Sequence, residues 1–256
     1  MKKRFGFTLA EVLITLGIIG VVAAMTIPTL IQNTNSVKFQ SQFKKSISTL
    51  SQAALMAQAQ HDIDYAGLTA ASTDGNCSGD SLANPSAAGE YTMCGLFNST
   101  LAGQTYLGTY GNVPGATGAA GDHYEIAKVS AFDPDGYLIY SLADGSFVGF
   151  NPNTPATGCG ITPGNPITAA RLAAAAGSTA AGALHNCMGF IDVNGPTSPN
   201  REVTCADGTA ALGTDAAACA LATVGAQVND VYPIVFHNGT VEPASNAARA
   251  ALTRAK

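Results

Sequence analysis

The chain opens with MKKRFGFTLAEVLITLGIIGVVAAMTIPTLI, residues 1–31, and this stretch decides how the rest of the protein is placed. The run from Phe7 to Ile31 is mostly apolar. As a helix that rises about 1.5 Å per residue, it is long enough to cross a hydrocarbon core about 30 Å thick. Lys2, Lys3 and Arg4 precede it, so the positive-inside rule keeps the N-terminus in the cytoplasm and sends the remainder outward.

Two features of this stretch do not fit an ordinary secretory signal peptide. The apolar run lacks a clear cleavage site of the small-x-small type, and Val22-Ala23-Ala24 is its nearest match. Glu11 also lies inside the run. A lone charge in hydrocarbon is costly and usually has a functional partner. The alternative is a glutamate that only reaches toward the interface near the helix end.

The segment KKRFGFTLAE, Lys2 to Glu11, resembles the leader of type IV prepilins and type II secretion pseudopilins. This resemblance implies that residues 1–6 are a leader, which a prepilin peptidase of the inner membrane removes between Gly6 and Phe7. Phe7 would then become the N-methylated first residue. Glu11 would stand fifth, where the family carries its glutamate, and Pro28 twenty-second, where many members have a helix-kinking proline.

The chemistry of Glu11 agrees with this mapping. Cleavage would create a cationic amine at Phe7, and Glu11 offers an anion at a similar depth. The glutamate of one subunit can then pair with the amine of a neighbour, which neutralises both charges in a low-dielectric filament core and sets the axial register. Small residues such as Gly17 and Gly20 permit close contact between helices.

The helix is expected to continue beyond the membrane, over residues 32–63. One apolar stripe recurs there at steps of three and four residues, against Gln, Ser and Lys on the other side: Phe39, Phe43, Ile47, Leu50 and Ala54. We expect such a helix to pack one face against a sheet. We expect it to end between Asp62 and Gly67.

Residues 64–256 are expected to form an extracytoplasmic head. Tyr137–Leu142 and Phe147–Phe150 flank Asp144-Gly145, a favoured hairpin dipeptide. A second hairpin joins Tyr232–Phe236 to Thr240-Val241 through Asn238-Gly239, and Phe190–Val193 is a further short strand. Residues 72–123 are expected to be loop, residues 169–176 and the tail 246–256 short helices, and Pro233 indicates a sheet edge or the entrance of a strand.

The predicted fold class is therefore α+β: a long N-terminal helix on a small antiparallel sheet, with long disulfide-bearing loops. All the cysteines follow residue 76 and are even in number, which favours disulfides in an oxidising compartment: Cys77, Cys94, Cys159, Cys187, Cys205 and Cys219. Six cysteines allow about fifteen pairings. The short loops Cys77–Cys94 and Cys205–Cys219 are plausible and leave Cys159 with Cys187, while other pairings stay open.

A resemblance to pilin-like proteins extends weakly into the head. FIDVNG, residues 190–195, followed by Pro199-Asn200, is similar to a stretch found in many of them. Since some pseudopilins bind calcium in a C-terminal loop, this implies a possible calcium site at Asp192, Asn194 and Asp207, whose oxygens suit that ion. The alternative is an Asx-turn in which these side chains bond the local backbone. No other cofactor is expected.

Composition and motifs limit the remaining function classes. The net charge of −5 argues against nucleic-acid binding. No nucleophile motif and no phosphate-binding loop is recognisable, so we expect a structural protein and not an enzyme. The resemblance to prepilins implies as partners further copies, other pilins, the prepilin peptidase, the inner-membrane assembly platform and the bilayer. The alternative is a membrane-anchored binding or adhesin domain that does not polymerise.

Overall fold

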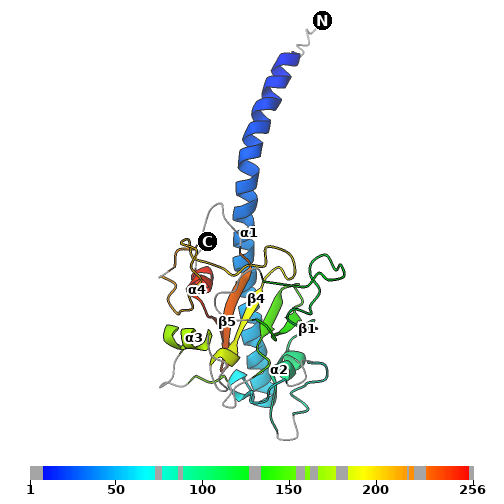
Figure 1. Cartoon of the computed structure of the whole chain (residues 1–256), viewed down its shortest axis with the longest axis vertical. Helices are drawn as coiled ribbons and strands as arrows, with labels where there is room; N and C mark the ends of the chain where they lie inside the picture. The colour runs from blue at the N-terminus through cyan, green and yellow to red at the C-terminus, as the bar shows by residue number, and fades with distance from the viewer. Residues whose placement is uncertain are drawn as a thin grey trace.

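A computed structural model describes residues 8–72, 77–85, 89–126, 134–153, 159–161, 167–176, 184–217, 219–221 and 229–253. One long helix, α1 (Leu9–His61), stands out from a head that gathers around its C-terminal half (Figure 1). Three disulfides lie in the head. The predicted α+β class is confirmed.

Helix α1 has well-defined ends. Thr8 is its N-cap and forms a capping box with Glu11, and Asp62 ends the helix in the left-handed conformation at φ 57°. The helix continues through Pro28, which lacks the N–H that an inner turn needs. A kink at Pro28 stays a prediction.

The head contains a six-stranded antiparallel sheet in the order β1-β2-β3-β4-β5-β6. Its strands are β1 (Thr105–Thr109), β2 (Leu138–Ser141), β3 (Phe147–Phe150), β4 (Met188–Asp192), β5 (Val231–His237) and β6 (Thr240–Pro243). Both predicted hairpins are confirmed, and Gly145 supplies the positive φ that the first turn requires.

Short helices complete the head: η1 (Tyr65–Gly67), α2 (Met93–Thr100), α3 (Ala169–Ala176), η2 (Leu184–Cys187) and α4 (Asn246–Thr253). The helix predicted over 169–176 is confirmed, and so is a helix in the tail. The prediction that residues 72–123 are all loop is wrong, because α2 and β1 lie within them. Thr92 caps α2, and the helix buries Leu96 and Phe97.

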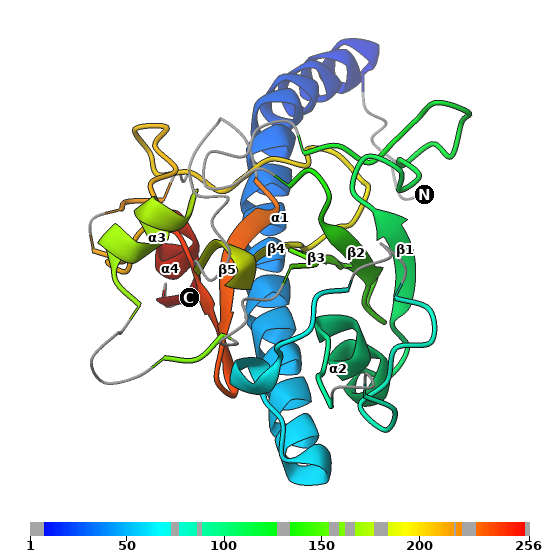
Figure 2. The ribbon, with the colours of Figure 1, turned by 60° about the horizontal axis from the view of Figure 1, so that its bottom comes forward.

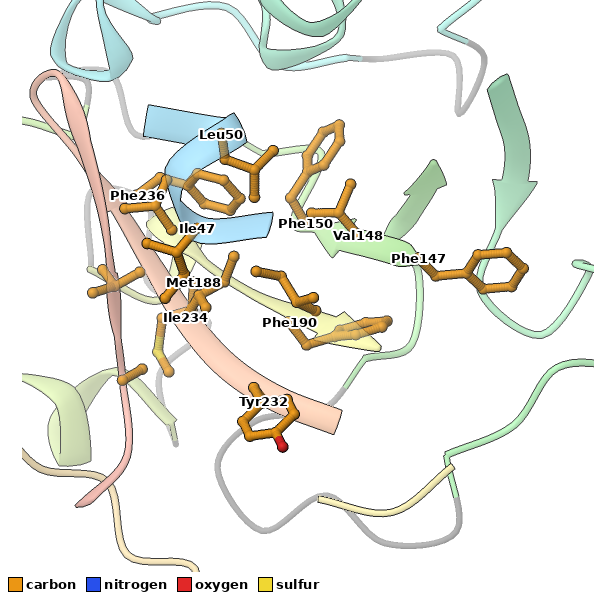
Figure 3. Close-up of a cluster of buried hydrophobic side chains, with 14 of the residues drawn as sticks. Ile47, Leu50, Phe147, Val148, Phe150, Met188, Phe190, Tyr232, Ile234 and Phe236 are labelled. Atoms are coloured by element: carbon orange, nitrogen blue, oxygen red, sulfur yellow. The ribbon is translucent and has the colours of Figure 1, made fainter. Parts of the chain in front are cut away.

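The predicted stripe of α1 packs on one face of the sheet. The Phe43 ring stacks on Tyr232 of β5 at 4.1 Å between centroids, and Phe39, Ile47 and Leu50 are also buried. Figure 2 shows α1 crossing behind β4 and β5, and Figure 3 draws Ile47 and Leu50 in one buried cluster with side chains of these strands. Helix α2 extends this layer, where Phe97 meets the Phe150 ring edge to face.

The opposite face of the sheet is covered as well. Side chains alternate between the faces of a strand, yet every residue of β4 and of β5 is buried. Tyr124, from the loop after β1, covers Phe147 of β3, and Leu172 of α3 is fully buried. The head thus has three layers: helices, sheet, and a cover of loops and α3.

The sequence placed Pro233 at a sheet edge or strand entrance, and that prediction is wrong. Pro233 is the third residue of β5, which lies between β4 and β6. The structure tolerates it because the carbonyl of Ala244, on the β6 side, accepts instead from the Gly213 N–H at 3.0 Å. The carbonyl of Pro233 still accepts from the Ala244 N–H.

Replacing Phe43 with alanine should destabilise the head strongly. The ring is fully buried, and removing such a ring costs about 3–5 kcal/mol. Urea unfolding of the full chain in detergent, followed by tyrosine fluorescence, measures the effect. Ser41→Ala, on the exposed side of the same helix, is the matched control. Equal midpoints for the two variants would contradict the packing of α1 on the sheet.

Candidate functional site

Glu11 is held by the N-terminal turn of its own helix. The backbone N–H and the hydroxyl of Thr8 both donate to Glu11 Oε2, at 2.8 and 2.9 Å, and the Glu11 N–H donates to Thr8 Oγ1 at 3.3 Å. This reciprocal capping box satisfies donors that a helix end otherwise leaves open. A single Thr8–Glu11 pair therefore orders the start of α1 and fixes where the carboxylate lies.

The segment that follows Glu11 presents an apolar surface on all sides. Leu9–Pro28 is the one stretch of the described residues long and apolar enough to cross a membrane, and none of it is buried in the head. The hydroxyls of Thr15 and Thr26 donate to backbone carbonyls of the preceding turn, so these polar groups are satisfied within the helix. A Cβ added at Gly17 or Gly20 would meet nothing within 4 Å.

The predicted cleavage site is not part of this geometry. Gly6 and Phe7 belong to residues 1–7, outside the described part of the chain. Their roles in cleavage and methylation stay predictions. The same holds for the amine that would pair with Glu11.

Comparison with protein families finds the prokaryotic N-terminal methylation motif at residues 1–27. This motif spans Gly6, Phe7, Glu11 and most of the apolar segment. The chain carries the signal motif of type IV pilins and pseudopilins. No curated protein and no solved structure matches the chain.

The motif indicates what kind of protein carries this apolar helix, which its composition alone does not. It indicates a type IV pilin-like protein that a prepilin peptidase processes. Together with the exposed helix near the N-terminus, it fits a single-pass, membrane-anchored pilin precursor.

In the head the six cysteines form three disulfides. The pairs are Cys77–Cys94, Cys159–Cys187 and Cys205–Cys219, the arrangement that the short loops favoured. The paired cysteines are 17, 28 and 14 positions apart in the sequence. They stabilise these long loops by restricting the unfolded chain.

The structure places the two carboxylates among the candidate calcium ligands in different surroundings. Asp192, at the end of β4, is fully buried and accepts from the Tyr124 hydroxyl at 2.8 Å and from the Asn194 N–H at 3.2 Å. Asp207 is exposed and accepts from the N–H and hydroxyl of Thr209. Both carboxylates form the local bonds expected of Asx-turns.

No group of three His, Cys, Asp or Glu residues able to hold a metal occurs in the described parts of the chain. Calcium binding therefore gains no support here and stays a prediction.

Sequence reasoning missed Asp230, the acidic neighbour of Asp192. Asp230 is buried just before β5 and accepts from the N–H groups of Asn200 and Arg201, at 3.0 and 2.8 Å. Burial raises its pKa to about 6, and burial, followed by the charge of Asp230, raises the pKa of Asp192 well above its ordinary value. The signal was an Asp directly preceding the apolar run Val231–Phe236, where a charge has to be explained.

Asp230 should make the head less stable as the pH rises. Its folded pKa lies above its unfolded value, so its contribution is complete below about pH 4 and is lost as the pH rises through about 6. The shift corresponds to about 3 kcal/mol. Between about pH 4 and pH 6 the midpoint of thermal unfolding should therefore change less for Asp230→Asn than for the unmodified chain.

Asp207→Asn is the matched control for this measurement, because hydrogen bonds from Thr209 lower the pKa of that exposed carboxyl. If Asp230→Asn and Asp207→Asn kept the pH dependence of the unmodified chain, the burial of an ionisable Asp230 would be contradicted.

Proposed function

We propose that this protein is a structural subunit that assembles through its N-terminal helix into a helical filament, either a type IV pilus or a type II secretion pseudopilus. The observation that carries the proposal is the methylation motif at residues 1–27, which covers nearly all of an apolar helix segment, Leu9–Pro28, that lies outside the head. An apolar helix of this length needs either lipid or other helices around it. The bilayer covers it in the precursor, and neighbouring copies cover it in the filament.

Glu11 is the residue that selects the filament over the bilayer. Removal of the leader after Gly6 creates the amine of Phe7, and a neighbouring subunit's Glu11 pairs with it. The pair neutralises two charges that are each costly in hydrocarbon. Because a buried ion pair requires close geometry, it also sets the axial position of each subunit. Before cleavage no such amine exists, so the precursor stays in the membrane.

The head makes the outer part of the filament. It carries the disulfides and the exposed loops, while the capped helix provides the shared core. Proteins with this motif are structural subunits, and we assign no catalytic role to any residue. The partners are other copies, other pilins, the prepilin peptidase and the inner-membrane assembly platform.

The second candidate is an anchored extracytoplasmic binding domain that uses α1 only as a tether. The two proposals differ in where the mature chain is found. Cells that produce the full chain with its cognate assembly system should release it on shearing, as filaments that an antibody against the head decorates in electron micrographs. A processed chain that stays entirely in the membrane fraction, with no decorated filaments, would favour the tether.

A further inference from the structure

Helix α1 has an outer face that its own head leaves uncovered. Opposite the buried stripe, exposed residues recur at alternating steps of three and four: Lys38, Ser41, Lys45, Ser48, Gln52 and Leu55. Residues at this spacing share one side of a helix. The apolar segment Leu9–Pro28 precedes them and is not buried either. One exposed surface therefore runs along α1 from the membrane segment to the end of the head that lies farthest from the N-terminus (Figure 1).

The charge of this surface changes along its length. Residues 12–61 contain no Asp or Glu, and their lysines lie close together at Lys38, Lys44 and Lys45. Residues 46–127 contain no Lys or Arg, and Asp62 and Asp64 follow α1 directly. The surface is therefore cationic near the membrane segment and anionic at the far end of α1. Two such ends, taken from different copies, attract each other.

Large apolar side chains lie at two levels of the same surface. Val37 is 50% exposed, and Leu55 and Met56, near the end of α1, are 55% and 45% exposed. Between Val37 and Leu55 the described part of the chain exposes no other large apolar side chain of the helix. These two residues are 18 positions apart, about five turns, so they lie on the same side of α1. Exposed apolar groups at such a place indicate contact with another protein surface.

The lysines lie too far from the bilayer for its surface to attract them strongly. Lys38 is ten positions beyond Pro28, about 15 Å along the helix, and Lys45 is about 25 Å beyond it. The attraction of a charged lipid surface falls off within about 8–10 Å at physiological salt. Lys45 also bonds Asp144 of its own head at 3.0 Å, yet its side chain stays 64% exposed. A protein surface of opposite charge is therefore the partner that fits.

We propose that the far end of α1 in one copy packs on the membrane-proximal part of this surface in a second copy, stacked farther along the fibre axis. A shift of 18 positions aligns Leu55 with Val37, and a shift of 24 aligns Asp62 with Lys38. One displacement of about 31 Å brings both pairs within about 5 Å of the same level. Because the contact joins two different surfaces, it repeats from copy to copy and builds an open filament. The stacking of copies is taken from the proposed function.

The second copy is not the one whose amine pairs with Glu11. Phe7 and Glu11 are four positions apart in the sequence, whereas the contact of the outer face spans 18 to 24 positions. The outer face therefore meets a copy farther along the fibre, and the two contacts act on different neighbours.

Crosslinking tests which parts of neighbouring copies meet. Lys38→Cys and Asp62→Cys are placed in separate, differently tagged full chains, which are produced together with the cognate assembly system and treated with a bismaleimide. The native cysteines do not react, because all six are paired. The two chains together should give a mixed dimer joined through positions 38 and 62, and neither chain alone should give a dimer. A mixed dimer without filaments would support the contact and count against the filament.

Absence of the mixed dimer has two readings that the filaments separate. No dimer in cells whose filaments an antibody against the head decorates would overturn this contact and leave the proposed function standing. Neither dimer nor filaments would overturn both.

Reversal of charge tests the ion pairing. Lys38→Glu and Asp62→Lys should each reduce filament number about threefold, within the range expected for one exposed ion pair. Cells that produce both variants should recover, because each chain then supplies the charge that the other needs. Arg171→Glu, on α3 in the cover of the opposite sheet face, makes the same change of charge and should assemble normally. A loss that the paired variants do not restore would assign Lys38 to another partner, such as lipid, and would overturn the proposal.

Discussion

Replacing Glu11 with glutamine should abolish filament formation while leaving membrane insertion and leader cleavage intact. Glutamine can keep the capping box with Thr8, because its amide oxygen still accepts from the Thr8 N–H. It removes only the negative charge. Loss of one partner from a buried ion pair costs about 3–5 kcal/mol, which corresponds to a reduction of at least about a hundredfold.

The glutamine variant separates two roles of the same side chain. Glu11→Ala removes both the bonds that Thr8 donates to the Glu11 carboxylate and the charge, so the two variants should be equally defective if the charge governs assembly. Filaments are counted in the sheared fraction, and processed chain is measured in membranes. Glu90→Gln, in the exposed part of the head, is the matched control for loss of a carboxylate. Normal filament numbers with Glu11→Gln would mean that Glu11 acts only as a helix cap.

Replacing Gly6 with valine should leave the whole chain as an uncleaved membrane precursor. The resemblance implies cleavage after this glycine, and a branched side chain beside the scissile bond should hinder the peptidase. Without cleavage the amine at Phe7 does not exist, and Glu11 has no cationic partner. Filaments should be absent, because without cleavage neither the methylation of Phe7 nor the ion pair with Glu11 can form.

The retained mass of the leader, measured on the intact chain, checks this prediction. Gly17→Ala is the matched control, because an added Cβ at that position meets nothing within 4 Å and the site lies outside the leader. It should be cleaved normally. A Gly6→Val chain that lost its leader at the usual rate would contradict the assigned cleavage site.

Much of the fold follows from periodicity and turn chemistry. The stripe from Phe39 to Ala54 predicted a helix with one buried face, and α1 buries that face against β6 and against Tyr232 of β5. Asp144-Gly145 and Asn238-Gly239 predicted the two hairpins because their turns favour residues that accept positive φ, as Asn238 and Gly145 do. These signals are local, so a single sequence is enough to reveal them.

The elements that were missed depend on contacts distant in sequence. Helix α2 has eight residues and is rich in Gly, Asn, Ser and Thr, which favour turns, and Phe97 holds it in place against Tyr140, Phe150 and Phe236. Strand β1 has a register shift near Gly108 and no clean alternation. Asp230 was missed for the same reason, since only the fold brings it beside Asp192.

The candidate site residues also differ in how far the sequence could predict them. Glu11 was recognisable because a charge in an apolar run is exceptional. The structure shows in addition that its carboxylate accepts hydrogen bonds from Thr8. The candidate calcium ligands rested on residue type alone. The structure gives Asp192 and Asp207 different burial and different partners, which residue type does not predict.

The mass of the mature N-terminus tests the central claim most directly. The full chain is produced with its cognate prepilin peptidase, purified from membranes and analysed by mass spectrometry of its N-terminal peptide. The account predicts a chain that begins at Phe7 with a methylated amine. A chain that begins at Met1, or one cut after Ala24, would contradict it.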